Sequence, residues 1–246
     1  MDQRQLIKDF LHKRHFNQVA PIAALIDMDG TLYDSMGHHA DAWMMAIADE
    51  GLPARREEFF IWEGQTGAAT INNLFRRTFG HDASPADVER IYGRKTEFFR
   101  QMGPVDIMPG AEEMIDVLLR SDIRCVLVTG SGQRSLIDRI QRDFPGAFPE
   151  ERMVTSRDVE KGKPHPEPFI RALQKAGVRR WQAIAVENAP LGVKSASAAG
   201  VFTVGVVTGP IPVNEMSDAS VVYNSMPEFA HDLPQLLLQL LTTFVP

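Results

Sequence analysis

Cysteine, basic clusters and long apolar runs are scarce or missing in this sequence. Its one cysteine, Cys125, excludes an internal disulfide and suits a reducing compartment such as the cytoplasm. No apolar run reaches the roughly 18 residues that a membrane-spanning helix needs. The net charge is -6 and no run of Lys or Arg occurs, which argues against nucleic acid as the partner. We therefore expect a cytoplasmic protein that binds neither membrane nor nucleic acid.

The composition is that of an ordinary globular protein, with 44% hydrophobic and 24% charged residues in a chain of 246. This length permits one large domain or two small ones. Cys125 lies inside the aliphatic run 124–128, so we interpret it as a buried structural thiol and not as a nucleophile. Residues 2–16 have helical apolar spacing and are expected to pack on the core. A mitochondrial-type presequence is the alternative, which Asp2 and Asp9 weaken.

Two carboxylates, Asp27 and Asp29, follow the first aliphatic run, which predicts a buried strand. Successive side chains of a strand point to opposite faces, so both acids lean to one side and Met28 leans to the other. Like charges this close repel unless a cation or a proton intervenes. A polar turn through Gly30 is the alternative interpretation. A calcium-binding EF-hand loop is set aside, because its twelfth position would be His38 and not Glu.

Apolar residues recur at helical spacing between Met36 and about Met102, without a strand-like run. This pattern predicts an all-helical insertion, and Pro104 and Gly110 mark its end. We expect a helical domain at residues 35–103 and an α/β core domain formed by residues 1–34 and 104–246.

Strand and helix patterns alternate after Gly110. Strands are predicted at residues 123–129, 152–155, 183–187 and 201–207, with an edge strand at 219–223, and helices at 133–143, 167–176, 191–199 and 233–244. This order implies βαβ units and a doubly wound, Rossmann-like parallel sheet, so the fold class is α/β with an inserted all-helical domain. The last helix is expected to dock on the core, with an oligomer surface as the alternative.

Polar residues follow several of the predicted strands. Because the carboxyl ends of parallel strands face one crevice, these residues are expected to meet there. They are Asp27, Asp29, Thr129, Gly130, Ser131, Lys163, Glu187 and Asn188. Carboxylate and amide oxygens suit Mg²⁺, while a lysine, a hydroxyl and a helix N-terminus suit phosphoryl oxygens. Taken singly, each could be an ordinary loop residue or a solvated charge. The prediction of a site therefore rests on their meeting at one edge of the sheet.

The stretch Asp27-Met28-Asp29-Gly30-Thr31-Leu32 resembles the first motif of the haloacid dehalogenase superfamily of phosphotransferases. Thr129, Lys163 and the pair Glu187-Asn188 resemble its second, third and fourth motifs, in order and at fitting spacing. The resemblance covers about residues 22–225, and the helical insertion corresponds to the family's cap domain. Within the superfamily, the chain is most similar to the β-phosphoglucomutase-like phosphatases.

This resemblance implies a Mg²⁺-dependent phosphatase of small phosphorylated metabolites, sugar phosphates among them. Asp27 is implied to attack phosphorus and form an aspartyl-phosphate, with Asp29 acting as acid and then as base. The implied ligands of Mg²⁺ are the Asp27 carboxylate, the Asp29 carbonyl and the Glu187-Asn188 pair. Thr129, Gly130, Ser131 and Lys163 are implied to hold phosphate, and His39, Gly64 and Thr66 are the candidate substrate contacts of the cap.

Two departures from the family pattern bear on the activity. Asn188 stands where the fourth motif commonly has a second acid, so it offers an oxygen but no charge. Glu63 and Gly67 stand where the mutase branch has a lysine and an arginine that grip a second phosphate. A carboxylate repels phosphate, so hydrolysis is favoured over mutase action.

Three alternatives remain open at this stage. A phosphohexomutase is the nearest one. A signalling receiver also uses a phosphoacceptor Asp with Thr and Lys, but Asp29 and the helical insertion argue against it. A catalytically weak scaffold is motivated by Asn188. A monomer is expected, with a dimer as the alternative.

Overall fold

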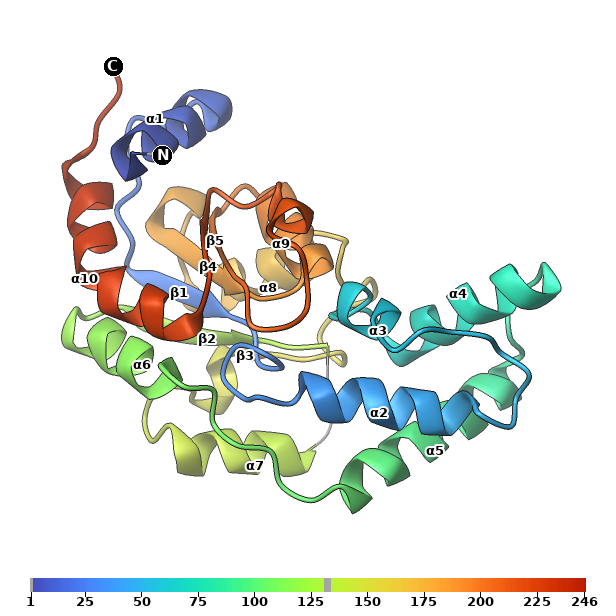
Figure 1. Cartoon of the computed structure of the whole chain (residues 1–246). Coiled ribbons are helices and arrows are strands. Elements are labelled where there is room, and N and C mark those ends of the chain that lie inside the picture. Colours follow the sequence, from blue (N-terminus) through green and yellow to red (C-terminus); the bar gives the residue numbers. More distant parts are fainter. Residues whose placement is uncertain (1, 131–133) are drawn as a thin grey trace.

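Six parallel strands form the sheet around which the chain is built, in the order β3-β2-β1-β4-β5-β6 (Figure 1). This computed structural model describes residues 2–130 and 134–246. The strands are β1 (Ala23–Ile26), β2 (Arg124–Val128), β3 (Met153–Val154), β4 (Ala183–Glu187), β5 (Phe202–Val206) and β6 (Val221–Tyr223). The order reverses beside β1, so the carboxyl ends of β1, β2 and β4 lie together at the point where such folds bind ligands.

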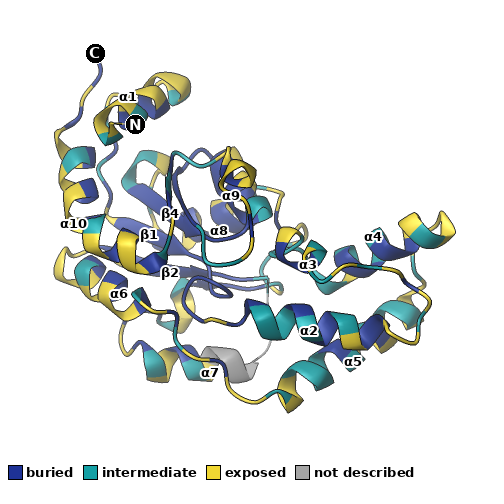
Figure 2. Cartoon of the chain, viewed as in Figure 1, coloured by how far each residue is buried: buried dark blue, intermediate teal, exposed yellow. Residues whose placement is uncertain are grey.

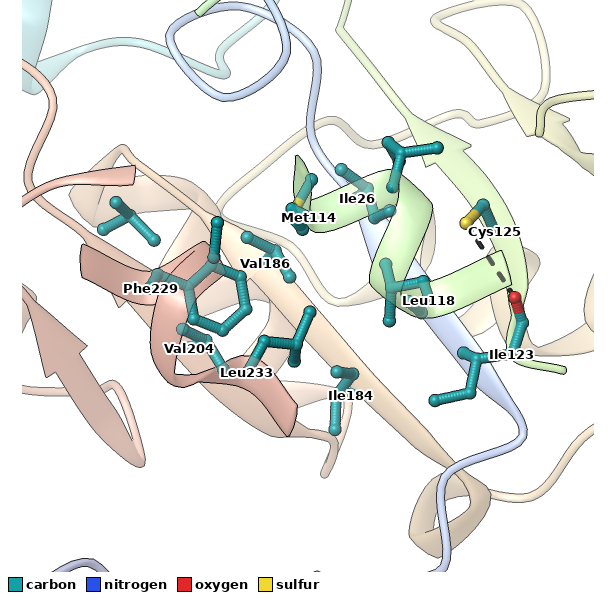
Figure 3. Close-up of a cluster of buried hydrophobic side chains, with 14 of the residues drawn as sticks. Ile26, Met114, Leu118, Ile123, Cys125, Ile184, Val186, Val204, Phe229 and Leu233 are labelled. Carbon is teal, nitrogen blue, oxygen red and sulfur yellow. Dashed lines mark hydrogen bonds between the residues drawn. The ribbon is translucent and has the colours of Figure 1, made fainter. Parts of the chain in front are cut away.

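Helices cover both faces of the sheet, because the side chains of each strand alternate between two apolar layers. On one face Ala24 and Ile26 pack with residues of α1 (Gln3–Arg14), α6 (Ala111–Arg120), α7 (Arg134–Asp143) and α10 (Met226–Thr242). On the other face Ala23 and Leu25 pack with residues of α8 (Glu167–Ala176) and α9 (Pro190–Ala198). Figure 3 shows Phe229 and Leu233 of α10, with Met114 and Leu118 of α6, lying over strand residues of the first face. The expected doubly wound α/β sheet is therefore confirmed.

Residues 36–101 contribute four helices that stand apart from the sheet (Figure 1). They are α2 (Met36–Ile47), α3 (Glu58–Ile61), α4 (Gly67–Phe79) and α5 (Pro85–Gln101). Their buried apolar side chains form a cluster of their own, which includes Trp43, Phe59, Ile71 and Ile91, and yellow exposed positions mark their outer surface in Figure 2. This group of helices is called the helical segment below. It has its own apolar core and also packs on the sheet domain through Val193, Ile211 and Met216.

Two helices differ from the sequence prediction. Helix α10 begins at Met226 and not at Leu233, because Ser225 caps its first turn by accepting a hydrogen bond from the Glu228 backbone N–H at 3.2 Å. Helix α6 was not predicted, although Met114, Ile115 and Leu118 give it a buried stripe. Within the described residues, short 3-10 turns lie at Glu150–Arg152, Arg180–Gln182 and Val213–Met216.

Cys125 and the terminal helix lie where the sequence predicted. Cys125 is fully buried in β2, and burial raises the pKa of its thiol to about 12, so it stays protonated. Helix α1 buries Ile7, Phe10 and Leu11 against the core. Within the described part of the chain, no helix is both long and apolar enough to cross a membrane.

Candidate active site

Asp27 and Asp29 lie just beyond β1, at the carboxyl edge of the sheet. The Asp27 backbone N–H donates to the carbonyl of Val186 at 3.0 Å, which extends the pairing of β1 with β4 by one residue. Both acids are buried and line the same small cavity, of about 60 Å³, while Met28 packs into the core on the other side. The strand thus presents two carboxylates to one enclosed space.

Lys163 brings a cation to this pair of acids from the loop that precedes α8. Its Nζ atom donates to Asp27 Oδ1 and to the Val128 carbonyl, the latter at 3.1 Å, and lies 2.6 Å from Glu187 Oε1. Burial would lower the pKa of Lys163, but the carboxylates of Asp27 and Glu187 outweigh burial and raise it. The lysine is therefore a fixed positive charge that three neighbouring elements hold in place.

Glu187 is fully buried beside Lys163. Its carboxylate pairs with the Lys163 ammonium, which it shares with Asp27. Burial, and then the charge of Asp27, raise the pKa of Glu187 to about 8, and burial also raises the pKa of Asp27. One lysine thus faces two buried carboxyl groups, so the site favours a second cation, either a proton or a metal ion.

The donor set fits a hard divalent metal ion. Among the residues that the structure describes, no three His, Cys, Asp or Glu side chains are grouped to hold a metal. The expected set has only two acidic side chains, Asp27 and Glu187, and adds the Asn188 amide and the Asp29 carbonyl. The observation in favour of this fit is the buried Glu187 carboxylate, whose one ion-pair partner among the described residues is the Lys163 ammonium that it shares with Asp27, since carboxylate oxygens of this kind are what Mg²⁺ binds.

Gly30 and Asn188 are packed against each other at the base of the site. Gly30 has φ +81°, and a Cβ atom there would lie 2.0 Å from Asn188 Nδ2. Thr31 Oγ1 donates to Asn188 Oδ1 at 3.3 Å. The turn after β1 therefore fixes the amide that follows β4, and only glycine fits at its centre.

Gly192, in the first turn of α9, makes room for the Glu187 carboxylate. A Cβ at this position would lie between 2.1 and 2.2 Å from the three carboxyl atoms of Glu187. We expect Gly192→Ala to lower the free energy of unfolding by about 1–3 kcal/mol, because the buried carboxylate must move in a packed core. The matched control is Gly93→Ala in α5, where the added Cβ meets nothing within 4 Å; helix propensity then predicts a gain of up to about 1 kcal/mol. Urea unfolding of both variants measures the difference, and equal effects would refute this role of Gly192.

Asp29 is the end of a chain of polar contacts that starts in α5. Its Oδ1 accepts a hydrogen bond from Ser35 Oγ at 2.7 Å and lies 3.1 Å from His39 Nε2, while His39 Nδ1 lies 2.6 Å from Lys95 Nζ. Since the lysine donates, we assign the imidazole proton to Nε2, which donates to Asp29. Burial would raise the pKa of Asp29, but His39 and Ser35 outweigh it and lower the pKa. Burial lowers the pKa of His39 and of Lys95.

Aromatic side chains of the helical segment enclose the rest of the cavity. His39 stacks on Phe99 with ring centroids 4.2 Å apart, and Lys95 Nζ lies 5.6 Å from the Trp43 ring centroid and 5.0 Å from that of Phe99. The helical segment contributes His39, Trp43, Phe59, Trp62, Glu63, Gly64, Gln65, Gly67, Thr70, Tyr92, Lys95 and Phe99 to the lining, and the sheet domain contributes Asp27, Asp29, Thr129 and Gly130. The cavity is therefore shared between the two parts of the chain.

The loop between α3 and α4 closes the cavity against the sheet domain. A Cβ at Gly130 would lie 3.3 Å from the Gly64 carbonyl oxygen, and a Cβ at Gly64 would lie 2.9 Å from Lys163 Cδ. A Cβ at Gly162 would lie 3.1 Å from Thr66 Cγ2, so three glycines allow the close approach of the two surfaces. Thr66 also caps α4 by accepting a hydrogen bond from the Ala69 backbone N–H at 3.2 Å.

The predicted site residues fall into three groups. Asp27, Asp29, Lys163, Glu187 and Asn188 meet at the ends of β1 and β4, while Thr129 and Gly130 follow β2 and line the same cavity. From the helical segment, His39 contacts Asp29 and Gly64 lines the cavity, while Thr66 is not among the lining residues and lies against Gly162. Ser131 lies outside the described residues.

Lys95 was missed by the sequence analysis. It is buried in α5, where it lies four residues after Ile91 and four before Phe99 on one helical face. A lysine within an apolar stripe is the signal that could have revealed it, because burying its charge requires a partner.

Several known proteins resemble this chain in sequence or in structure. The family model for haloacid dehalogenase-like hydrolases matches residues 23–200. Hexitol phosphatase A of Escherichia coli is 28% identical over 82% of this chain and 90% of its own length. Validoxylamine A 7'-phosphate phosphatase of Streptomyces hygroscopicus is 27% identical over 75% of this chain and 85% of its own. A solved structure described as "Putative beta-phosphoglucomutase" from Bacteroides vulgatus superposes with a TM-score of 0.93, at 40% identity, over 97% of this chain and 98% of that one.

Proposed function

Because this chain belongs to the haloacid dehalogenase-like hydrolases, we propose that it is a phosphatase of small phosphorylated metabolites, sugar phosphates among them. The observation that carries the proposal is the buried contact of Asp27 with Lys163, at the strand end where Asp29, Thr129 and Glu187 also gather. A carboxylate held beside a fixed cation, in a cavity with a second acid, suits nucleophilic attack on a phosphate ester. The named activities of the two phosphatase relatives support the same substrate class.

The first half of the proposed reaction forms a bond between an Asp27 carboxylate oxygen and phosphorus and breaks the bond between phosphorus and the ester oxygen. Asp29 gives its proton to the leaving oxygen, and Lys163 balances negative charge on the phosphoryl oxygens. His39 and Ser35 lower the pKa of Asp29, so it must gain a proton before this step. The negative charge of an arriving phosphate ester favours that protonation.

The second half releases the phosphoryl group to water. Asp29, now ionised, takes a proton from the water that attacks phosphorus, and the bond between phosphorus and Asp27 breaks to give inorganic phosphate. The hydrogen bonds from Ser35 and His39 hold the Asp29 carboxylate in place for this step. Phosphatases of this family generally use a divalent metal; Asp27, the Asp29 carbonyl, Glu187 and Asn188 would hold Mg²⁺ here, and the ion would supply positive charge to the phosphoryl oxygens.

The helical segment is proposed to act as a cap domain, residues 35–103, over a core domain of residues 1–34 and 104–246. The cavity of about 60 Å³ is far smaller than the roughly 300–1,000 Å³ of ordinary ligand pockets. A sugar phosphate therefore requires the loop between α3 and α4 to move away from Gly130 and Lys163 and to return after binding. Closure then excludes bulk water from the aspartyl-phosphate.

Phosphate release from a panel of phosphorylated metabolites, with and without Mg²⁺, tests this function. We expect turnover of p-nitrophenyl phosphate and of hexose or hexitol phosphates that EDTA reduces by at least about 100-fold, because the excess carboxylate charge then lacks its second cation. Adding Mg²⁺ back is expected to restore the rate. Calcium serves as the comparison ion, since its larger size and longer oxygen distances fit the same ligands less well. Full activity in EDTA would contradict the metal assignment, and no release from any ester would contradict the phosphatase.

A phosphohexomutase is the second candidate, which the resemblance to the Bacteroides vulgatus structure supports. The two activities differ in where the phosphoryl group goes, to water or to a second hydroxyl of a sugar. Conversion of β-glucose 1-phosphate to glucose 6-phosphate without phosphate release would favour the mutase.

A further inference from the structure

Glu63 places a third acid in the cavity, from the loop that joins α3 to α4. It lines the cavity together with Asp27 and Asp29, although it belongs to the helical segment and they belong to the sheet domain. Burial raises its pKa to about 8, and the charges of Asp29 and Asp27 add to this rise. The loop also contacts Lys163 and Gly130, so Glu63 is carried into the site by the same segment that closes it.

The lysines that the structure places at this cavity already contact other side chains. Among the described lining residues, Lys95 is the one cation that the helical segment supplies. Its Nζ atom contacts His39 and lies over the Trp43 and Phe99 rings; burial lowers its pKa, which the charges of Glu63 and Asp29 only partly offset. Lys163, the cation of the sheet domain, is paired with two carboxylates at the other end. A second anionic group on a substrate would therefore meet no available cation near Glu63.

The remaining lining near this loop is neutral. Gln65 and Thr70 offer an amide and a hydroxyl, and Trp62 and Tyr92 offer aromatic surface. Such surfaces suit the C–H faces and hydroxyls of a polyol, and a carboxyl group pairs readily with hydroxyls. Glu63 supplies no positive charge, and when it is ionised, above its pKa of about 8, it repels a second phosphate or a carboxylate on the leaving group in the closed cavity.

We infer that Glu63 selects phosphate monoesters whose leaving group is an uncharged polyol or sugar, and that it rejects those carrying a second anionic group. The inference rests on the proposed phosphatase function and assigns its specificity to one residue of the loop. Selection here works through unfavourable charge against the wrong substrate as much as through hydrogen bonds to the right one.

Fructose 6-phosphate and fructose 1,6-bisphosphate form the test pair, because they differ only in the second phosphate. The wild-type chain and Glu63→Gln, Glu63→Lys and Glu89→Gln are compared by kcat/KM for phosphate release, and by Kd from the fluorescence of the cavity residues Trp43 and Trp62. Glu89 is exposed on α5, so its change matches the net charge of Glu63→Gln without altering the cavity.

At about pH 9, above the pKa of Glu63, we expect the wild-type chain to favour the monophosphate by about tenfold or more in both measurements, since like charges in a closed site of low dielectric repel strongly. Glu63→Gln is expected to shrink that preference at least about fivefold, Glu63→Lys to reverse it, and Glu89→Gln to change it less than about twofold. An unchanged preference in Glu63→Gln, or equal binding of both sugars by the wild-type chain, would overturn the inference. Absence of turnover in the wild-type chain would refute the proposed function, while the Kd ratios would still decide the role of Glu63.

Discussion

Asp27→Asn is expected to abolish phosphate release, with a fall in kcat of at least about 10³-fold. The amide has nearly the shape of the carboxylate, but its oxygen is a poor nucleophile and carries no charge. The substitution should be well tolerated by the fold, because Asp27 is buried, burial already disfavours its ionised form, and an amide oxygen still accepts from Lys163. Steady-state release of phosphate from p-nitrophenyl phosphate measures the effect.

Asp34→Asn is the matched control for this prediction. It makes the same chemical change a few residues away in the chain, at an exposed position outside the cavity. We expect its kcat to stay within about twofold of the wild-type value, as is usual for surface substitutions away from the site. If Asp27→Asn retained a comparable rate while remaining folded, Asp27 would not be the nucleophile.

Lys163→Met is expected to reduce both activity and stability. Removing the ammonium leaves Asp27 and Glu187 as buried carboxylates without their cation, and breaking a buried ion pair in this way costs about 3–5 kcal/mol. We expect a drop in the free energy of unfolding of that size when urea unfolding is measured in EDTA. The rate of phosphate release is expected to fall about 100-fold to 1,000-fold, the usual effect of removing one stabilising group at a transition state.

The control for Lys163 is Lys175→Met. Lys175 pairs with Asp158 at 2.7 Å, and both side chains are about one third exposed. Ion pairs of this kind contribute about 0.2–1 kcal/mol, so a small loss of stability and no loss of activity are expected. If the two variants lost similar amounts of stability and activity, Lys163 would contribute no more than a surface ion pair does and would not be the fixed cation of the site.

The sheet was predictable from sequence because its strands are short aliphatic runs separated by helical patterns. The acids after β1 and Lys163 before α8 could be brought together by topology alone, since strand ends of a parallel sheet share one edge. The start of α10 at Met226 was missed because the prediction followed the leucines and overlooked the cap at Ser225. Helix α6 was also missed, although its apolar stripe could have predicted it.

The helical side of the cavity could not be derived in the same way. The contact of Lys95 with His39, and of the loop at Gly64 with Lys163 and Gly130, depends on how two separately packed parts of the chain meet. The spacing of apolar residues predicts each helix, but it does not predict which surface of the sheet domain the helical segment contacts. Glu63 was noticed only as a departure from a family pattern, and its place beside Asp27 and Asp29 required coordinates.

Trapping the phosphoenzyme tests the central claim most directly. Asp29→Asn removes the base for hydrolysis, but p-nitrophenolate leaves without a proton, so the phosphoryl group should reach Asp27 and stay there. After rapid denaturation of Asp29→Asn mixed with p-nitrophenyl phosphate and Mg²⁺, peptide mass spectrometry should find one phosphoryl group on Asp27. Phosphate found on another residue, or turnover through direct attack of water with no modified peptide at any time, would contradict the account.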